Sequence, residues 1–373
     1  MNKSASLKDM EKDLLFVGSV PLDTSEEVFR LIGDSGLSAA APCLPDGEVG
    51  ERQYWIVGLG YRVYHGHPDI ETVNRPAPIN GIENWRATSA SDNWTFRVKD
   101  GVTEIHFGDP GWRLGYARDA LNSYFVFKTL REEGAISNQA RFQVCLPLTY
   151  SGIGTLFRDI GDWPVMSAAY EEAMAAEVAM IVAKIPHEDL AIQWDFCVEL
   201  GMIEGGGAKS GHGSWNDLQT PPAALIGASI AHMSPLIPPE VMLGFHLCYG
   251  TLGGWPMRPS NDLDRAVDAV HLILDRAGRR VDFVHIPILD NVGSEYFTPL
   301  QNLNHGNTKI YFGVIHNMSD LGDFRNKITR CAQYLDDFGV AAPCGFGRYS
   351  AAEMAAVIED HQTALQILNE MRA

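Results

Sequence analysis

The residues of this chain best suited to chemistry are one histidine and two cysteines that are distant in the sequence. His246 and Cys248 end an apolar run that starts at Val241, and Cys344 follows much later. Residues two apart in a β-strand point to the same face, so His246 and Cys248 can bind one ion together. One imidazole and two thiolates suit zinc better than magnesium or calcium. Ligands from separate strand ends would leave a coordination position open for a substrate, which indicates catalysis. The alternative is that all three side chains are core residues, since cysteine is often buried.

The composition predicts a globular protein with a large core. The chain has 373 residues, 46% of them hydrophobic, which is too long for a small domain unless it forms a barrel or a decorated α/β fold. The formal charge of −18 argues against nucleic acid and anionic membranes as partners, because such binding needs clustered lysine and arginine. The composition leaves open whether the protein forms an oligomer.

Targeting signals are not evident in the sequence. No stretch reaches the roughly 18 apolar residues of a membrane span. The apolar run Leu14–Val17 is too short for a secretory signal, and the six cysteines are dispersed, unlike those of a disulfide scaffold. A cytoplasmic location is therefore expected.

Short β-rich runs alternate with stretches of helical length, which predicts a parallel α/β architecture. Eight strands are predicted, at Leu14–Gly18, Ala39–Leu44, Arg141–Leu146, Leu190–Asp195, Val241–Cys248, Val281–Ile286, Lys309–Ile315 and Val340–Cys344. Amphipathic helices are predicted at Ser167–Lys184, Leu263–Ala277, Asp323–Phe338 and Ser350–Met371. Eight strand–helix units make a (β/α)₈ barrel, the TIM barrel, so residues 1–373 are predicted to form one such domain.

Polar residues that could act in a site lie at or just beyond the carboxyl end of almost every predicted strand. They are Ser19, Asp46, Glu48, Asp195, His246, Cys248, His285, His316 and Cys344. Active sites of this fold form where the carboxyl ends of the strands meet. The sequence therefore predicts that these side chains converge.

The predicted second and third strands are too far apart for an ordinary loop, so residues 51–135 are predicted to form a structured insertion that caps this face. Within it, Trp94–Val98 and Thr103–Phe107 flank an Asp-Gly pair, which predicts a β-hairpin. The insertion is rich in aromatic residues, namely Trp55, Tyr61, Tyr64, Trp85 and Trp112. These rings either cap the pocket and select an apolar or aromatic substrate, or only pack the insertion onto the barrel.

Two groups of charged residues near the predicted site have two interpretations each. Asp46, Glu48 and Arg52 lie in one polar loop. They either bind substrate or act in acid-base chemistry, or they form a salt-bridged turn that anchors the aromatic insertion. Arg348 either binds a carboxylate, sulfonate or phosphate, for which guanidinium offers a planar set of donors, or braces the last loop.

Five motifs, in this order, resemble the catalytic barrel of cobalamin-independent methionine synthase and of its single-barrel relatives, which include epoxyalkane:coenzyme M transferases. The motifs are Val17–Pro21 (the opening Gly-Ser loop), Ile192–Asp195 (the fourth-strand aspartate), Phe245–Tyr249 (His-x-Cys-Tyr), Ile315–His316 (the strand-seven histidine), and Pro343–Gly345 with Arg348 (Cys-Gly). The resemblance covers most of the chain.

This resemblance implies a zinc-dependent transferase that moves a methyl or alkyl group to or from a thiol that zinc activates. The histidine and two cysteines introduced first would bind Zn²⁺ and keep the thiol nucleophilic. Ser19 and Asp195 would orient a polar end of the substrate, and His316 would deliver a proton to the leaving group. The partners would be a small-molecule thiol and an alkyl or methyl donor.

The chain departs from methionine synthase at two places. That family has a glutamate as the fourth zinc ligand, where this chain has Pro287. His285, two positions earlier, could replace it, or water could fill the position, or His285 could be a polar lining of the barrel. Phe196-Cys197 stands in place of the family's Glu-Pro, which argues against an amino-acid substrate.

Two other functions remain open. One is a metal-independent lyase or decarboxylase on the related barrel of uroporphyrinogen decarboxylase. The other is a noncatalytic sensor that binds zinc or a thiol.

Overall fold

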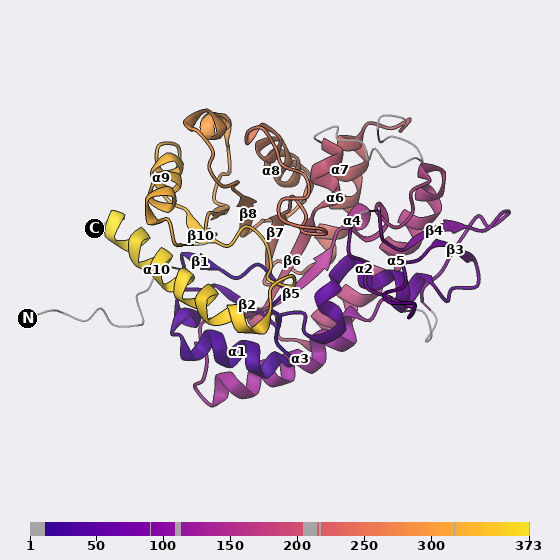
Figure 1. Ribbon diagram of the computed structural model, residues 1–373, viewed down its shortest axis with the longest axis horizontal. Helices are drawn as coiled ribbons and strands as arrows, with labels where there is room; N and C mark the ends of the chain where they lie inside the picture. Colours follow the sequence, from indigo (N-terminus) through magenta and orange to yellow (C-terminus); the bar gives the residue numbers. More distant parts are fainter. Residues whose placement is uncertain are drawn as a thin grey trace, which may run out of the picture.

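The computed structural model describes residues 12–89, 91–108, 113–203, 215, 218–316 and 318–372 (Figure 1). Within these residues, eight parallel strands form a nearly closed barrel. In spatial order they are β1 (Leu14–Leu15), β10 (Gly339–Ala341), β9 (Lys309–Gly313), β8 (Phe283–Pro287), β7 (Met242–Leu247), β6 (Leu190–Phe196), β5 (Arg141–Pro147) and β2 (Cys43–Pro45). At the seam between β1 and β2, the amide of Leu14 donates to the carbonyl of Ala40 at 3.1 Å. The predicted TIM-barrel fold is confirmed, and each of the eight predicted strands overlaps an observed strand, although several observed strands end at other residues.

Helices surround the strands (Figure 1). The longer ones are α1 (Ser25–Asp34), α3 (Tyr116–Glu132), α5 (Trp163–Lys184), α7 (Pro222–Met233), α8 (Asp264–Arg276), α9 (Leu321–Ala332) and α10 (Met354–Arg372), and the short ones are α2 (Trp55–Leu59), α4 (Thr149–Ile153) and α6 (Val198–Ile203). The four predicted helices correspond to α5, α8, α9 and α10. Helix α9 ends at Ala332, earlier than predicted, and the chain then turns to enter β10. None of the described helices has both the length and the apolar character needed to cross a bilayer.

The interior of the barrel below the strand ends is polar and hydrogen-bonded. Gln143 on β5 donates to the amide oxygen of Gln193 on β6 at 3.2 Å. Gln193 in turn donates to Asp195 Oδ1 at 2.7 Å and to the carbonyl of Val17 at 2.8 Å. Buried polar groups need such partners, because an unpaired one costs free energy. The two amides therefore support the end of β1 and the carboxylate at the end of β6.

The segment between β2 and α3 differs from the sequence prediction. Strand β4 (Thr95–Val98) pairs antiparallel with β3 (Ile70–Asn74), not with residues 103–107, so the predicted hairpin is wrong. Beyond the Asp-Gly turn, Ile105 and Phe107 are buried, and the Phe107 ring lies 5.6 Å from that of Tyr64. Packing into the core thus replaces strand pairing there. Helix α3 packs against α1 and α5 in the outer layer of the barrel, although it falls inside the predicted insertion.

Candidate metal centre

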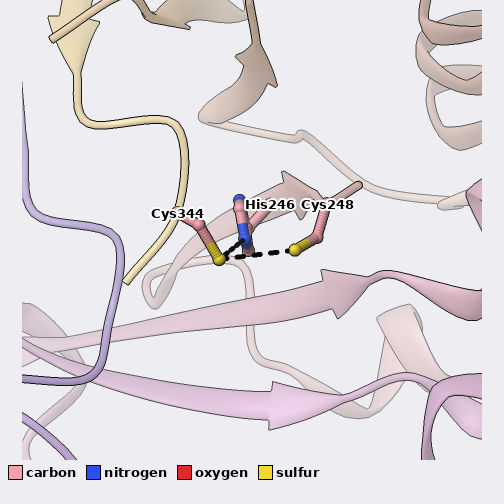
Figure 2. Close-up of side chains that lie close together, drawn as sticks. All are labelled: His246, Cys248 and Cys344. Carbon is pink, nitrogen blue, oxygen red and sulfur yellow. Dashed lines mark hydrogen bonds between the residues drawn. The ribbon is translucent and has the colours of Figure 1, made fainter. Parts of the chain in front are cut away.

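The structure brings His246, Cys248 and Cys344 together at the carboxyl ends of the strands (Figure 2). His246 lies near the end of β7, Cys248 follows that strand directly, and Cys344 lies in the loop after β10. The Cys248 and Cys344 sulfurs are 3.4 Å apart, and Cys344 Sγ is 3.8 Å from His246 Nε2. One ligand atom from each residue lies within 4.8 Å of the others.

This donor set fits zinc in type and in spacing. Around a tetrahedral zinc with Zn–S of about 2.3 Å and Zn–N of about 2.0 Å, two sulfurs lie about 3.8 Å apart and a sulfur and a nitrogen about 3.5 Å apart. The observed separations, 3.4 Å between the sulfurs and 3.8 Å between Cys344 Sγ and His246 Nε2, differ from these values by a few tenths of an ångström. Two cysteines and one histidine are also among the ligand sets that zinc accepts in catalytic sites.

His285, the candidate fourth ligand, is not part of this cluster. In the sheet register His246 pairs with His285, so Cys248 lies level with Pro287, which offers no side-chain ligand. At about 3.3 Å per residue, His285 starts roughly 6–7 Å below the level of Cys248. Its Nδ1 is 2.8 Å from His246 Nδ1, and its Nε2 is 3.0 Å from the carbonyl oxygen of Ala342. Both nitrogens of His285 thus face partners other than the two sulfurs.

Burial keeps both histidines neutral, the form in which imidazole binds metal. Burial, with a smaller effect from His285, lowers the pKa of His246 well below its usual value. Burial also lowers the pKa of His285 to about 4, although hydrogen bonds to the backbones of Ala342 and Leu247 act in the opposite direction and raise it. Hydrogen bonds with the Cys197 and Cys344 thiols, together with burial, raise the pKa of the Cys248 thiol. A bound divalent cation would oppose that last effect, because it favours the thiolate.

A cavity opens next to the three side chains. Its polar lining includes Ser19, Glu48, Asp195 and Arg348, and its apolar lining includes Ile56, Val57, Leu252 and Met257. These residues come from the carboxyl end of β6, from helix α2, and from the segments that follow β1, β2, β7 and β10. The predicted convergence of strand ends therefore holds for this group of residues.

Glu48 and Asp195 form a buried carboxylate pair in the cavity wall. One ligand atom of each lies within 4.8 Å of the other and of the Cys145 sulfur. The Ser19 hydroxyl donates to Glu48 Oε2. Burial, opposed by the hydrogen bond from Ser19, raises the pKa of Glu48 to about 7. Burial and then the charge of Glu48 raise the pKa of Asp195 well above its usual value. The pair therefore retains a proton near neutral pH, because two adjacent buried charges repel each other.

Asp46 and Arg52 do not line this cavity but support Glu48. Arg52 Nη1 donates to Asp46 Oδ2 at 2.7 Å, and the Glu48 amide donates to Asp46 Oδ1 at 2.9 Å. Arg52 also lies 3.9 Å from Asp119. Glu48 has φ of 48°, in the left-handed region that few residues other than glycine adopt. Asp46 and Arg52 therefore form a salt-bridged turn, whereas Glu48 of the same loop lines the cavity.

His316 lies away from the cavity. Its Nε2 is 2.8 Å from the carbonyl oxygen of Ile288, and its Nδ1 is 3.1 Å from Asp290. Lys327 contacts the same carboxylate at 2.7 Å. Burial would raise the pKa of Asp290, but the hydrogen bonds from His316 and Lys327 prevail and lower it to about 2. The structure therefore holds the expected proton donor in a charged network outside the cavity.

Arg348 lies at the rim of the cavity. Its guanidinium is 5.7 Å from the centre of the Tyr54 ring, and burial lowers its pKa. In the described part of the chain, no carboxylate forms an ion pair with it. Arg348 also lines a neighbouring outer cavity with Trp255 and Tyr349. Its position at the junction of the two cavities suits contact with an anionic group of a ligand.

Sequence reasoning missed several cavity residues. Tyr54, Ile56 and Val57 line it, although other aromatic residues of the insertion were expected to do so. Cys197 also lines the cavity and hydrogen-bonds to Cys248. Cys197 lies two residues after Asp195 at the same strand end, so both side chains are expected on the same face, and the sequence could have indicated this.

The expected aromatic cap is only partly formed by the residues named for it. Trp85 packs on Tyr54 and Tyr61, with ring centres 5.1 and 4.6 Å apart. Tyr64 is fully buried and donates to the carbonyl of Gly152 at 3.2 Å. Trp112 and the side chain of Trp55 lie outside the described residues. Among the described rings named for the cap, Tyr61, Tyr64 and Trp85 do not line the cavity, whereas Tyr54, which was not named for it, does.

Comparison with known proteins supports the fold. No protein-family model matches the chain, and no curated protein matches it. Among solved structures, a protein of Listeria monocytogenes provisionally named a vitamin-B12-independent methionine synthase aligns with a TM-score of 0.50 and 11% identity. The alignment covers 93% of this chain and 86% of that one. A provisionally named phosphonomutase of Burkholderia cenocepacia aligns with a TM-score of 0.27 and 11% identity, over 63% of this chain and 88% of that one. At this identity the first likeness shows a shared barrel fold.

Proposed function

We propose that this protein is a zinc-dependent transferase that moves a methyl or alkyl group to or from a thiol. The observation that carries the proposal is the convergence of His246, Cys248 and Cys344 at the cavity, with ligand atoms within 4.8 Å of one another. Three protein ligands leave one zinc position open for a substrate. The residue of β8 that lies beside Cys248 is Pro287, which has no side chain able to bind the metal at that position. Zinc at this site would lower the pKa of a substrate thiol and keep it nucleophilic.

The carboxylate pair would bind the polar end of the thiol substrate. The Ser19 hydroxyl and the Gln193 amide hold Glu48 and Asp195 toward one another. With a pKa of about 7, Glu48 holds a proton that it can release to a leaving group in the cavity. This carboxyl thus takes the acid role that sequence reasoning gave to His316.

The remaining wall of the cavity suits the alkyl donor. Ile56, Val57, Leu252 and Met257 offer apolar contact to a methyl or alkyl group. Arg348 at the rim would bind an anionic substituent on either substrate, since guanidinium pairs with carboxylate, sulfonate or phosphate oxygens. The name of the Listeria protein of similar fold, a vitamin-B12-independent methionine synthase, agrees with methyl transfer.

Metal analysis of purified variants tests the zinc centre. We expect about one zinc per chain in the wild type and loss of most of it in Cys248→Ser and in Cys344→Ser, because each removes one thiolate. Cys331→Ser is the control, since Cys331 is also a free cysteine but is buried in α9, outside the cluster. Wild-type protein that is folded, metal-free and unable to take up added zinc would end the proposal.

The buried pair of Glu48 and Asp195 also favours one alternative, a metal-independent lyase in which the two carboxyl groups act as acid and base. Metal content separates this alternative from the transferase. X-ray absorption at the zinc edge, with a panel of thiols, should show one added sulfur ligand for the right thiol. Zinc and thiol binding without turnover of any methyl or alkyl donor would indicate a sensor instead.

A further inference from the structure

We propose that His285 is a positioning residue that fixes the tautomer of His246, so that the Nε2 lone pair of His246 faces the two cysteines. This inference rests on the proposed function, in which His246 is a zinc ligand. It gives His285 a role that differs from direct ligation. The contacts that support it form one chain from a backbone carbonyl to the metal centre.

The chain of contacts begins at Ala342. Its carbonyl oxygen can only accept a hydrogen bond, so the His285 Nε2 at 3.0 Å must carry a proton and donate it. The ring also lies near the carbonyl of Leu247, but the contact with a defined nitrogen and distance is that of Nε2 with Ala342. A neutral imidazole has one N–H, and its assignment to Nε2 leaves His285 Nδ1 as an acceptor. His246 Nδ1 lies 2.8 Å from that acceptor and must therefore be its donor. The second nitrogen of His246, Nε2, then carries the lone pair and lies 3.8 Å from Cys344 Sγ.

Neutrality of both rings is the condition for this assignment. His285 is fully buried and His246 is 4% exposed, so a charged imidazole at either place would lose its hydration. The His285 ring lies beside the neutral His246 ring and two backbone carbonyls, those of Ala342 and Leu247. A second proton on His285 would also place two N–H groups against each other across 2.8 Å.

Position 313 leaves room for these contacts. A Cβ atom added at Gly313 would lie 2.8 Å from His285 Nε2 and 2.7 Å from the Cα of Pro343. The His285 ring therefore crosses β9 over a residue with no side chain to reach the segment after β10. Because Ala342 lies two residues before Cys344, one ring links the segments that carry the histidine and cysteine ligands.

The expected consequence is a preorganised ligand. Histidines that bind metals usually donate their other N–H to a fixed acceptor, and loss of that acceptor typically weakens metal binding about 10–100-fold. Here the acceptor is a neutral imidazole that is itself fixed by a carbonyl. Without it, the His246 ring would be free to rotate or to adopt the other tautomer.

The first test is nitrogen-15 NMR of histidine-labelled, full-length, metal-free protein, which reads the tautomer of each ring from two-bond couplings. We expect a proton on Nδ1 of His246 and on Nε2 of His285. A proton on Nε2 of His246 in the wild type would overturn the proposal. This readout needs neither zinc binding nor activity.

The second test is zinc affinity, measured by competition with a chromophoric chelator. We expect the Kd for zinc to rise about 10–100-fold in His285→Phe and much less in His285→Asn, whose amide oxygen can accept from His246. His361→Phe is the control, because His361 is also buried but stacks on Phe16, where its ring centre lies 5.2 Å from that of the phenyl ring.

The outcomes separate this inference from the proposed function. If wild type binds zinc and His285→Phe binds it equally well, the positioning role is wrong and the zinc centre stands. If wild type binds no zinc, the proposed function fails, and the tautomers measured by NMR still decide the arrangement of the two rings. If His285→Phe does not fold, the wild-type spectrum again decides.

Discussion

Gly313→Ala should weaken zinc binding although Gly313 contacts no zinc ligand directly. The new Cβ would lie 2.7 Å from the Pro343 Cα and 2.8 Å from His285 Nε2, whereas ordinary contact begins at 3.4 Å. The neighbours must therefore shift by 0.6 to 0.7 Å, the differences between 3.4 Å and these two distances. Such a shift moves either the imidazole that orients His246 or the residue next to Cys344. Overpacking of this kind costs about 1–3 kcal/mol of stability.

The two measurements are urea unfolding of the metal-free protein and chelator competition for zinc. We expect a stability loss in the range above and a zinc Kd raised about tenfold, which is about 1.4 kcal/mol. Gly339→Ala is the matched control. A Cβ there would lie 2.4 Å from the Tyr311 ring and 2.8 Å from the carbonyl oxygen of Asp13, at the opposite end of β10. The control should lose comparable stability and keep its zinc affinity.

Two results would refute this reasoning. Equal zinc affinity in wild type and Gly313→Ala, with stability reduced, would show that the metal centre does not depend on the space at position 313. An equal loss of zinc affinity in Gly339→Ala would show that any overpacked strand glycine perturbs the centre, so that the loss says nothing about His285.

Two further predictions concern ionisable groups. Burial raises the pKa of Glu48 in the folded protein to about 7, from an ordinary value of 4.5. The folded state therefore binds more protons between these two pH values, and it loses stability as pH rises through them. Glu48→Gln should remove about 3 kcal/mol of this pH dependence in urea unfolding of metal-free protein, and an unchanged slope would contradict the burial of an ionisable carboxyl there. His316→Asn should keep zinc content and turnover, and should lose about 1 kcal/mol of stability because a half-exposed Asp290 loses one partner. A large loss of turnover with normal zinc content would restore the acid role for His316.

The fold and the convergence of His246, Cys248 and Cys344 could be predicted because both depend on local features. Strands buried on both faces read as apolar runs, as in β6, where all seven residues are buried. Strand parity and strand ends then placed His246 and Cys248 on one face, and the barrel brought Cys344 to them. The level of each residue along the barrel could not be predicted in this way, because register depends on how neighbouring strands pair.

His285 and His316 show the two kinds of failure. For His285, the predicted face of the strand was right, but the predicted height along the barrel was wrong. His285 pairs with His246, so it lies about two residues below the position on β8 that is beside Cys248. For His316 the strand end was misplaced, since β9 stops at Gly313 and the chain then turns toward Asp290. The predicted hairpin failed for a related reason, because a distant segment, Ile70–Asn74, pairs with β4.

The register also explains how charge would be balanced in the proposed centre. Asp195, His246 and His285 are partners in one row across β6, β7 and β8. Two thiolates and a neutral His246 would cancel the charge of a zinc ion, so a substrate thiolate would bring one uncompensated negative charge into the cavity. A fully ionised Asp195 and Glu48 would repel that charge, whereas a pair that holds a proton can donate a hydrogen bond toward it. The raised pKa values of this pair therefore favour binding of the thiolate, and tight thiol binding should decline as pH rises above about 7, where Glu48 ionises.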